Sequence, residues 1–328
     1  FLLQKIKIEL RESSNAAMES RRKNVAAVDR RRSTTNGRDY FDSFPEDIIL
    51  NILVRLPAKS IAKLRCVSKK FNSVLRSRDF TEMFFTRSCA QPPKLLFVCH
   101  ERGQLFFFSA PQPQDLDENE PPLTVNYHMK FECPGSFSEI YAPIAGLVCF
   151  RDYRCLGERE STYRESVTSV CNPSNGQCFL LPKIKKMNTR KRTWLKSFLG
   201  YDPVDKLYKV LAIISSNDGI SMEHKVLTLG SRESPWRTIQ CGTWHCPGSK
   251  LISIDGVLYY SAKVERGGTA SVIVCFDVRT ETFSFIPLAK EFLSYEASFF
   301  NYNGNFASFR WTTSEMISID IGSINSLH

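Results

Sequence analysis

The chain has 328 residues, which is long for one domain and comfortable for two at roughly 100–200 residues per domain. Hydrophobic residues make up 42% and charged residues 24%, values of a globular protein that exclude a fully disordered or collagen-like chain. The longest apolar stretch, about residues 141–150, is well short of the roughly 18–20 residues that a membrane helix needs. We therefore expect no interaction with a membrane.

The net charge of +10 lies almost entirely at the front of the chain. Residues 1–80 hold 18 Lys and Arg against 9 Asp and Glu, whereas residues 81–328 hold 26 against 25. This asymmetry indicates two functionally different parts and directs any acidic partner to the front. The neutral remainder makes nucleic acid an improbable ligand of the main domain.

The 11 cysteines include no C-x-x-C pair, and most of them stand beside apolar residues. Buried free thiols in a reducing compartment fit this pattern better than a disulfide framework. The chain also opens without a secretory signal pattern, so we expect the nucleus or the cytoplasm. Basic clusters at 21–23 and 30–32 resemble a two-part nuclear import signal, although a solvated tail is the plainer interpretation.

Residues 1–42 are polar and basic without sustained periodicity, so we interpret them as a disordered tail. Over residues 43–82, apolar residues recur at helical spacing and predict two or three short helices. An S-x-x-E pattern at residues 43–46 predicts a capping box for the first of them, with Pro45 in the first turn. About forty residues cannot comfortably hold a core alone, so a partner is expected to cover part of the apolar surface.

From residue 90 to 328 the sequence predicts strands. Apolar runs at 94–99 and 104–108 flank a turn-like segment, which indicates a hairpin. An apolar run, an Asn or Asp turn and a second apolar run recur at 170–182, 199–210 and 274–287, with two of the turns 105 residues apart. That is about two periods of 50 residues, the length of a kelch-type propeller blade. Residues 90–328 are enough for fewer than five such blades, so we expect an all-β, propeller-like domain that is incomplete or shortened and has an irregular final segment.

Residues 44–80 resemble an F-box in the order and spacing of their residues. Two positions depart from the family pattern, because Phe44 replaces the usual leucine and Phe71 the usual tryptophan. Segments 198–203, 224–230, 236–237, 254–260 and 276–279 are similar to the F-box-associated domain of plant F-box proteins. The fold class expected is therefore α+β multi-domain: a disordered tail over 1–42, a helical F-box over 43–82 and an F-box-associated β domain over 90–328.

The resemblance implies a substrate-recognition subunit of a Skp–cullin–F-box ubiquitin ligase that is itself non-catalytic. The F-box would bind the Skp adaptor and, through it, the cullin, while the β domain would bind a substrate protein whose identity and contact residues stay unknown. The adaptor-binding residues implied are Phe44, Pro45, Ile48, Ile52, Leu53, Leu56, Pro57, Leu64, Val67 and Phe71.

Other chemistry has weaker support in the sequence. Catalytic and phosphate-binding motifs are not found, so we expect neither an enzyme nor a cofactor. Cys241, His245 and Cys246 suggest zinc, but a structural site needs four ligands and no second pair matches, so no metal is expected. A basic run over residues 183–196 beside Trp194 could bind RNA or an acidic segment, although a solvated loop is preferred. The alternative function is a basic-tailed β-propeller that binds nucleic acid or protein outside any ligase.

Overall fold

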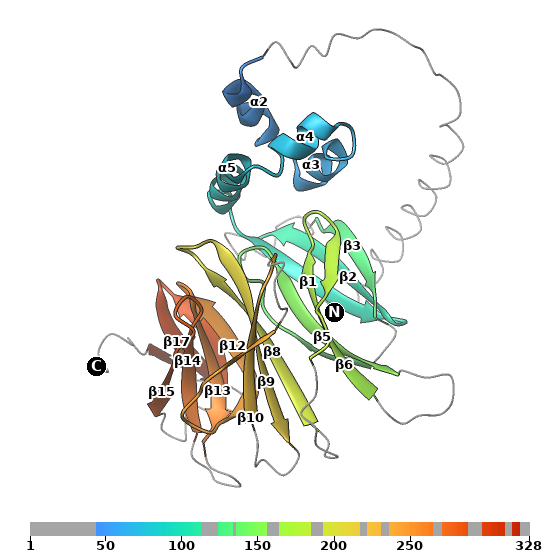
Figure 1. The fold of residues 1–328 in the computed structure, drawn as a ribbon. Helices are drawn as coiled ribbons and strands as arrows, with labels where there is room; N and C mark the ends of the chain where they lie inside the picture. Colours follow the sequence, from blue (N-terminus) through green and yellow to red (C-terminus); the bar gives the residue numbers. More distant parts are fainter. Residues whose placement is uncertain are drawn as a thin grey trace. The chain divides into compact units, whose positions relative to one another are not determined.

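The computed structural model describes residues 44–112, 124–133, 136–155, 164–184, 193–216, 222–230, 236–264, 271–287, 297–311 and 317–321. The chain divides into two compact units (Figure 1). The first unit takes in the chain up to residue 99 together with residues 106–129, and the second takes in residues 100–105 and everything from residue 130. The predicted basic tail, with its two clusters, lies outside the described residues.

Short helices open the described chain: α2 (Glu46–Leu53), α3 (Ala58–Leu64), α4 (Lys69–Val74) and α5 (Arg78–Cys89). The predicted capping box is wrong, because Pro45 is the N-cap residue of α2 and no side chain caps this end. The helix thus begins directly after the proline and too late for residue 43 to serve as its cap. Ser68 and Ser77 do cap helices, since their hydroxyls accept the backbone N–H of Phe71 and Phe80 at 3.1 Å.

The helices share a small hydrophobic core. Its buried members are Ile49, Leu53, Val54, Ile61, Leu75 and Phe80. Phe84 stacks on Phe80 with ring centroids 5.8 Å apart and extends the core along α5. Four helices therefore stand in the described residues where the sequence indicated two or three, because the apolar spacing continues past the predicted end at residue 82.

The strands form sheets in which sequence neighbours are also spatial neighbours. The first sheet contains β1 (Lys94–Glu101), β2 (Gln104–Pro111) and β3 (Asn126–Glu132), and the second contains β4 (Ser136–Ile140), β5 (Val148–Cys155), β6 (Arg164–Asn172) and β7 (Gln177–Leu180). The third contains β8 (Thr193–Asp202), β9 (Leu207–Ser216), β10 (Met222–Thr228) and β11 (Arg237–Ile239). The fourth contains β12 (Cys246–Ile254), β13 (Val257–Lys263), β14 (Ser271–Asp277) and β15 (Phe283–Pro287), and the last contains β16 (Ala297–Tyr302), β17 (Asn305–Trp311) and β18 (Ile317–Ile321). Short helices followed by an all-β, multi-sheet, propeller-like domain confirm the predicted fold class.

Local side-chain chemistry sets the turns between strands. Asn172, Asp202 and Asp277 each end a strand and accept a backbone N–H two or three residues further on, at 2.7–3.1 Å. These are the Asn and Asp turns of the recurring sequence pattern, so that prediction is confirmed. The hairpin between β1 and β2 is also present, with Arg102 and Gly103 both at positive φ.

The predicted number of blades was too low. The described residues form five sheets, and the first and last of these have three strands instead of four. Three-stranded sheets use less chain than the roughly 50 residues assumed for a kelch-type blade, so more sheets fit. The predicted irregular end is also wrong as far as residue 321, since β16, β17 and β18 pair in regular antiparallel register.

Apolar side chains from the middle sheets make the main core of the second unit. Phe198, Leu258, Tyr260 and Phe276 are almost fully buried in it, and Phe198 packs against Tyr260 with ring centroids 4.9 Å apart. Aromatic strand residues thus serve as core. Among the described residues, no helix is long and apolar enough to cross a membrane.

The cysteines only partly follow the sequence prediction. Cys149 and Cys275 are buried free thiols, and burial raises the pKa of Cys149 to about 12 and that of Cys275 to about 11. Cys171 and Cys178, however, are joined by a disulfide. The prediction of free thiols is wrong for this pair because the two residues face each other across β6 and β7, a register that the spacing of cysteines in the sequence does not reveal.

Candidate functional site

An apolar stripe along α2 faces outward. Phe44, Ile48 and Ile52 follow one another at intervals of four residues and are 53%, 42% and 53% exposed. Residues four apart on a helix share one face, so Ile48 and Ile52 form a continuous surface, with Phe44 just ahead of the helix. We call Phe44, Ile48 and Ile52 the α2 stripe.

The neighbouring positions on α2 face inward. Ile49 and Leu53 are only 5% and 4% exposed and belong to the small helical core. Each of them follows a member of the α2 stripe by one residue, which turns the side chain about 100° around the helix axis. One short helix therefore presents apolar side chains both to its own domain and to solvent.

The structure sorts the candidate adaptor-binding residues into two groups. The exposed ones are Phe44, Pro45, Ile48, Ile52, Pro57 and Val67. The ones that pack in or against the helical core are Leu53, Leu56, Leu64 and Phe71. Phe71, at the position where the family usually has tryptophan, is half-buried against the core and therefore contributes to the fold of the helices.

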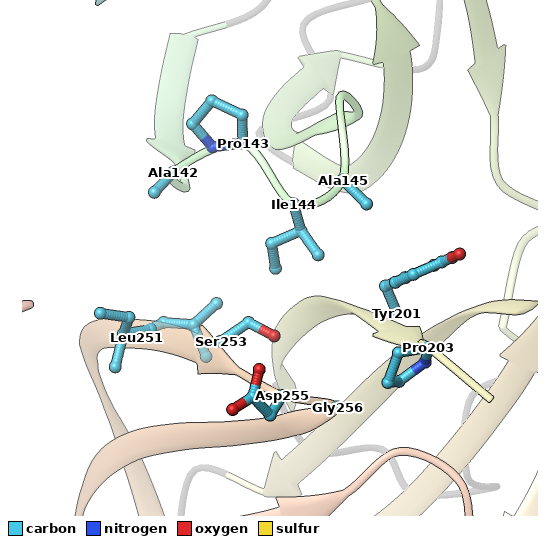
Figure 2. A pocket seen from close by; sticks show the side chains of 11 residues that line it. Ala142, Pro143, Ile144, Ala145, Tyr201, Pro203, Leu251, Ser253, Asp255 and Gly256 are labelled. Atoms are coloured by element: carbon cyan, nitrogen blue, oxygen red, sulfur yellow. The ribbon is translucent and has the colours of Figure 1, made fainter. Parts of the chain in front are cut away.

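A pocket of about 410 Å³ lies in the second unit where the segment ahead of β5 meets the ends of β8 and β12 and the turns that follow them (Figure 2). It is lined by residues 142–145 ahead of β5, by Tyr201 and Pro203 at the β8–β9 turn, and by residues 251–256 at the β12–β13 hairpin. The Tyr208 hydroxyl donates to the carbonyl of Ala145 at 2.6 Å and holds the first of these segments. The sequence did not identify substrate-binding residues. It could not show that these segments are close in space, because they lie far apart along the chain.

The lining of this pocket is mostly apolar, with few polar groups. Asp255 is the acidic residue among those that line it, and it sits at positive φ in the hairpin turn before Gly256. A Cβ atom on Gly256 would lie 2.8 Å from the Cδ of Pro203, so glycine lets the two turns approach closely. An apolar hollow with one carboxylate, built from strand ends and the turns beside them, suits an apolar side chain that is flanked by a basic or hydrogen-bonding group.

A polar cluster joins two sheets beside the core. Glu139 on β4 accepts hydrogen bonds from Tyr141 at 2.7 Å and Arg151 at 3.0 Å, and it also pairs with Lys196 on β8. Burial alone would raise the pKa of Glu139, but the bonds from Lys196, Tyr141 and Arg151 outweigh it and hold the pKa below its usual range. We interpret the cluster as part of the fold, because each of these side chains has an ion-pair or hydrogen-bond partner within it.

The basic run around residues 183–196 is not one continuous loop. Lys196 lies on β8 and is paired with Glu139, so it does not belong to a free basic surface. Trp194, at the start of β8, is 60% exposed. Residues 185–192 lie outside the described residues, so RNA binding and a solvated loop both stay untested there.

Comparison with known sequences places both parts of the chain. The pattern of the F-box domain matches residues 41–83, and that of the F-box associated beta propeller domain matches residues 94–324. The chain belongs to the plant F-box proteins.

Relatives of this F-box protein come from Arabidopsis thaliana. F-box protein DOR is 46% identical over 295 residues, which cover 90% of this chain and 72% of the relative. F-box protein At5g65850 is 40% identical over 302 residues, covering 89% of this chain and 70% of that relative. An uncharacterized protein from Listeria monocytogenes is similar in structure at 9% identity and a TM-score of 0.37, covering 71% of this chain and 60% of that one. A similarity at this level supports no conclusion.

Proposed function

We propose that this F-box protein is the substrate-recognition subunit of a Skp–cullin–F-box ubiquitin ligase. Its F-box binds a Skp-type adaptor and, through it, the cullin, and its β domain binds a protein substrate. The subunit bridges the two partners and performs no chemistry itself. The observation that carries the proposal is the α2 stripe, an exposed apolar surface on a helical domain that belongs to the F-box family.

The physical reason is that exposed apolar side chains on a small domain are costly without a partner. Water-accessible apolar area contributes roughly 25 cal/mol per Å² when it is covered. Ile48 and Ile52 are each about half exposed, so covering them recovers about half of the 1.5–3 kcal/mol of a fully buried side chain, or about 2 kcal/mol for the pair. The fold of the helices does not depend on this contact, because the core uses Ile49 and Leu53, which lie about 100° further around α2.

On the substrate side, we propose the pocket between residues 142–145, the β8–β9 turn and the β12–β13 hairpin as the recognition site. Its support is its apolar lining and its position where strand ends meet turns, since binding residues of β domains usually lie on such turns. The class of substrate that it suits is a peptide segment that inserts an apolar side chain next to a basic residue, which would pair with Asp255.

The test is capture of a purified Skp-type adaptor by the full chain and by the double variant Ile48→Asp with Ile52→Asp. Two carboxylates placed in an apolar contact add a desolvation cost at least as large as the lost burial. The expected loss is therefore at least about 100-fold in affinity, which corresponds to about 3 kcal/mol. Leu56 stays unchanged because it packs against the core, so the variant keeps its helices.

The matched control is Val204→Asp in the β domain, which places the same charge at an apolar residue that is 58% exposed. This control should bind the adaptor as the parent chain does. Capture of the adaptor by the double variant at the level of the parent chain would refute the proposed role of the α2 stripe and with it the ligase function.

A further inference from the structure

Three side chains with metal-binding atoms meet beside the main core of the β domain. His224 lies on β10, and Cys241 and His245 lie in the segment that connects β11 to β12. One ring nitrogen of each histidine and the Cys241 sulfur all lie within 4.8 Å of one another. His224 is 5% exposed and His245 is fully buried.

Strand register explains why these residues meet. His224 pairs with Ile239 across β10 and β11, and Cys241 follows Ile239 by two residues. The chain therefore leaves β11 next to His224 and then returns to begin β12 just after His245. The two imidazole rings lie with centroids 5.0 Å apart, and the Cys241 sulfur lies 3.8 Å from Nδ1 of His245.

We propose that His224, Cys241 and His245 bind a Zn²⁺ ion that joins β10 to the start of β12. Zinc prefers thiolate and imidazole ligands in a tetrahedral arrangement, with Zn–S about 2.3 Å and Zn–N about 2.0–2.1 Å. These lengths place neighbouring ligand atoms roughly 3.3–3.7 Å apart, close to the observed spacing between Cys241 and His245. Three protein ligands leave a fourth position for water or for another oxygen donor.

Within the residues that the structure describes, one nitrogen among the ligands lacks a partner, and a second ligand is held by a hydrogen bond. Nε2 of His224 is buried and has no hydrogen-bond partner in the described part of the chain, which is costly unless something binds it. The buried Tyr260 orients the ring of His245, because the Tyr260 hydroxyl lies 2.7 Å from Nε2 of His245. A metal-ligating histidine usually has such a hydrogen bond on its second ring nitrogen.

The protonation states allow coordination with a simple balance of protons. Zinc binds imidazole in its neutral form through a ring lone pair, so His224 and His245 each coordinate as neutral rings. Zinc binds cysteine as the thiolate, so coordination releases the proton of the Cys241 thiol to solvent. Nδ1 of His245 lies 3.1 Å from the carbonyl of Thr243, to which it donates in the metal-free chain. Coordination through Nδ1 replaces that bond, and the ring proton then sits on Nε2 and is donated to the Tyr260 oxygen. The oxidation state of every atom stays the same.

The experiment uses the full chain, freed of metal with a chelator and then titrated with Co²⁺ and Zn²⁺. Co²⁺ should bind at one equivalent and produce a thiolate-to-cobalt charge-transfer band, which Zn²⁺ then displaces. Cys241→Ser and His224→Gln should abolish the band, while their circular dichroism stays that of the parent chain. Tyr260→Phe should keep the band but weaken Zn²⁺ binding by about 10- to 100-fold.

The matched control is Cys246→Ser, because Cys246 is an exposed thiol directly next to His245 and outside the cluster. Its band should equal that of the parent chain. A parent chain without the band, or a band that survives Cys241→Ser, would overturn the site. Metal analysis of the purified chain that finds copper in place of zinc would overturn the assignment of the ion.

Discussion

Truncation to alanine should strongly destabilise the helices at one residue of α2 and leave them nearly unaffected at its neighbour. Leu53 is 4% exposed in the helical core and Ile52 is 53% exposed on the α2 stripe. Leu53→Ala removes a buried side chain and leaves a cavity, a change that costs about 2–5 kcal/mol. Ile52→Ala gives up at most about 1 kcal/mol of burial and gains a little from the better helix propensity of alanine.

The small size of the helical core makes the effect of Leu53→Ala large. Its fully buried part consists of six side chains, so the loss of one is a large share of what holds the helices together. A destabilisation of about 2–5 kcal/mol raises the population of the locally opened helices by about 30- to several-thousand-fold. Local opening of this kind is measured by backbone hydrogen exchange.

Hydrogen exchange read by mass spectrometry separates the two parts of the chain by peptide. Peptides from α2 to α5 should exchange much faster in Leu53→Ala and at the parental rate in Ile52→Ala. Peptides from β8 and β9 should stay unchanged in both variants and serve as the internal control. Equal acceleration by the two variants, or parental exchange in Leu53→Ala, would refute the assignment of inward and outward faces.

Further predictions concern the β domain and the front of the chain. Gly200→Ala should lower the melting temperature, because the new Cβ would lie 2.6 Å from Cγ2 of Val278. This decrease should be smaller when Gly200→Ala is made together with Val278→Ala. Equal decreases with and without Val278→Ala would contradict this packing. Glu139→Gln should destabilise the chain at neutral pH by leaving Lys196 without its ion pair. Because the folded-state pKa of Glu139 is lowered, its contribution is present above the ordinary glutamate pKa and is lost as the pH falls through the lowered value, so thermal melts of parent and variant should converge in acid. Deletion of residues 1–40 should leave the melting temperature nearly unchanged. These residues hold too few apolar side chains to offset the conformational entropy that ordering the backbone costs, about 1–2 kcal/mol per residue. A fall of several degrees would contradict this.

The parts of the fold that the sequence predicted well depend on short-range chemistry. Asn172, Asp202 and Asp277 form their turns with backbone groups two or three residues away, so the identity of the residue and its position suffice. Strands with evenly spaced turns then predict an antiparallel, multi-sheet domain. Counting its sheets was harder, because a sheet with three strands looks in the sequence like part of a longer blade.

The division of α2 was beyond the sequence for a different reason. Residues 48, 49, 52 and 53 are all Ile or Leu and make one broad apolar face. Hydrophobic periodicity gives the direction of such a face but not how much of it the domain itself covers. Only the placement of α3, α4 and α5 decides that Ile49 and Leu53 are buried while Ile48 and Ile52 stay open.

The cluster of His224, Cys241 and His245 shows where reasoning from motif spacing stops. The sequence directs attention to Cys241, His245 and Cys246, whereas the third member of the cluster, His224, is a single residue on another strand. His224 reaches the cluster through the register of β10 with β11, which no local spacing encodes. Cys246 is excluded by the same geometry, since successive side chains of an extended segment point to opposite sides and His245 points inward. In an all-β domain a further ligand is therefore to be sought on the strand that pairs beside the motif, as His224 is here. Cys246, the sequence neighbour of His245, is the natural control.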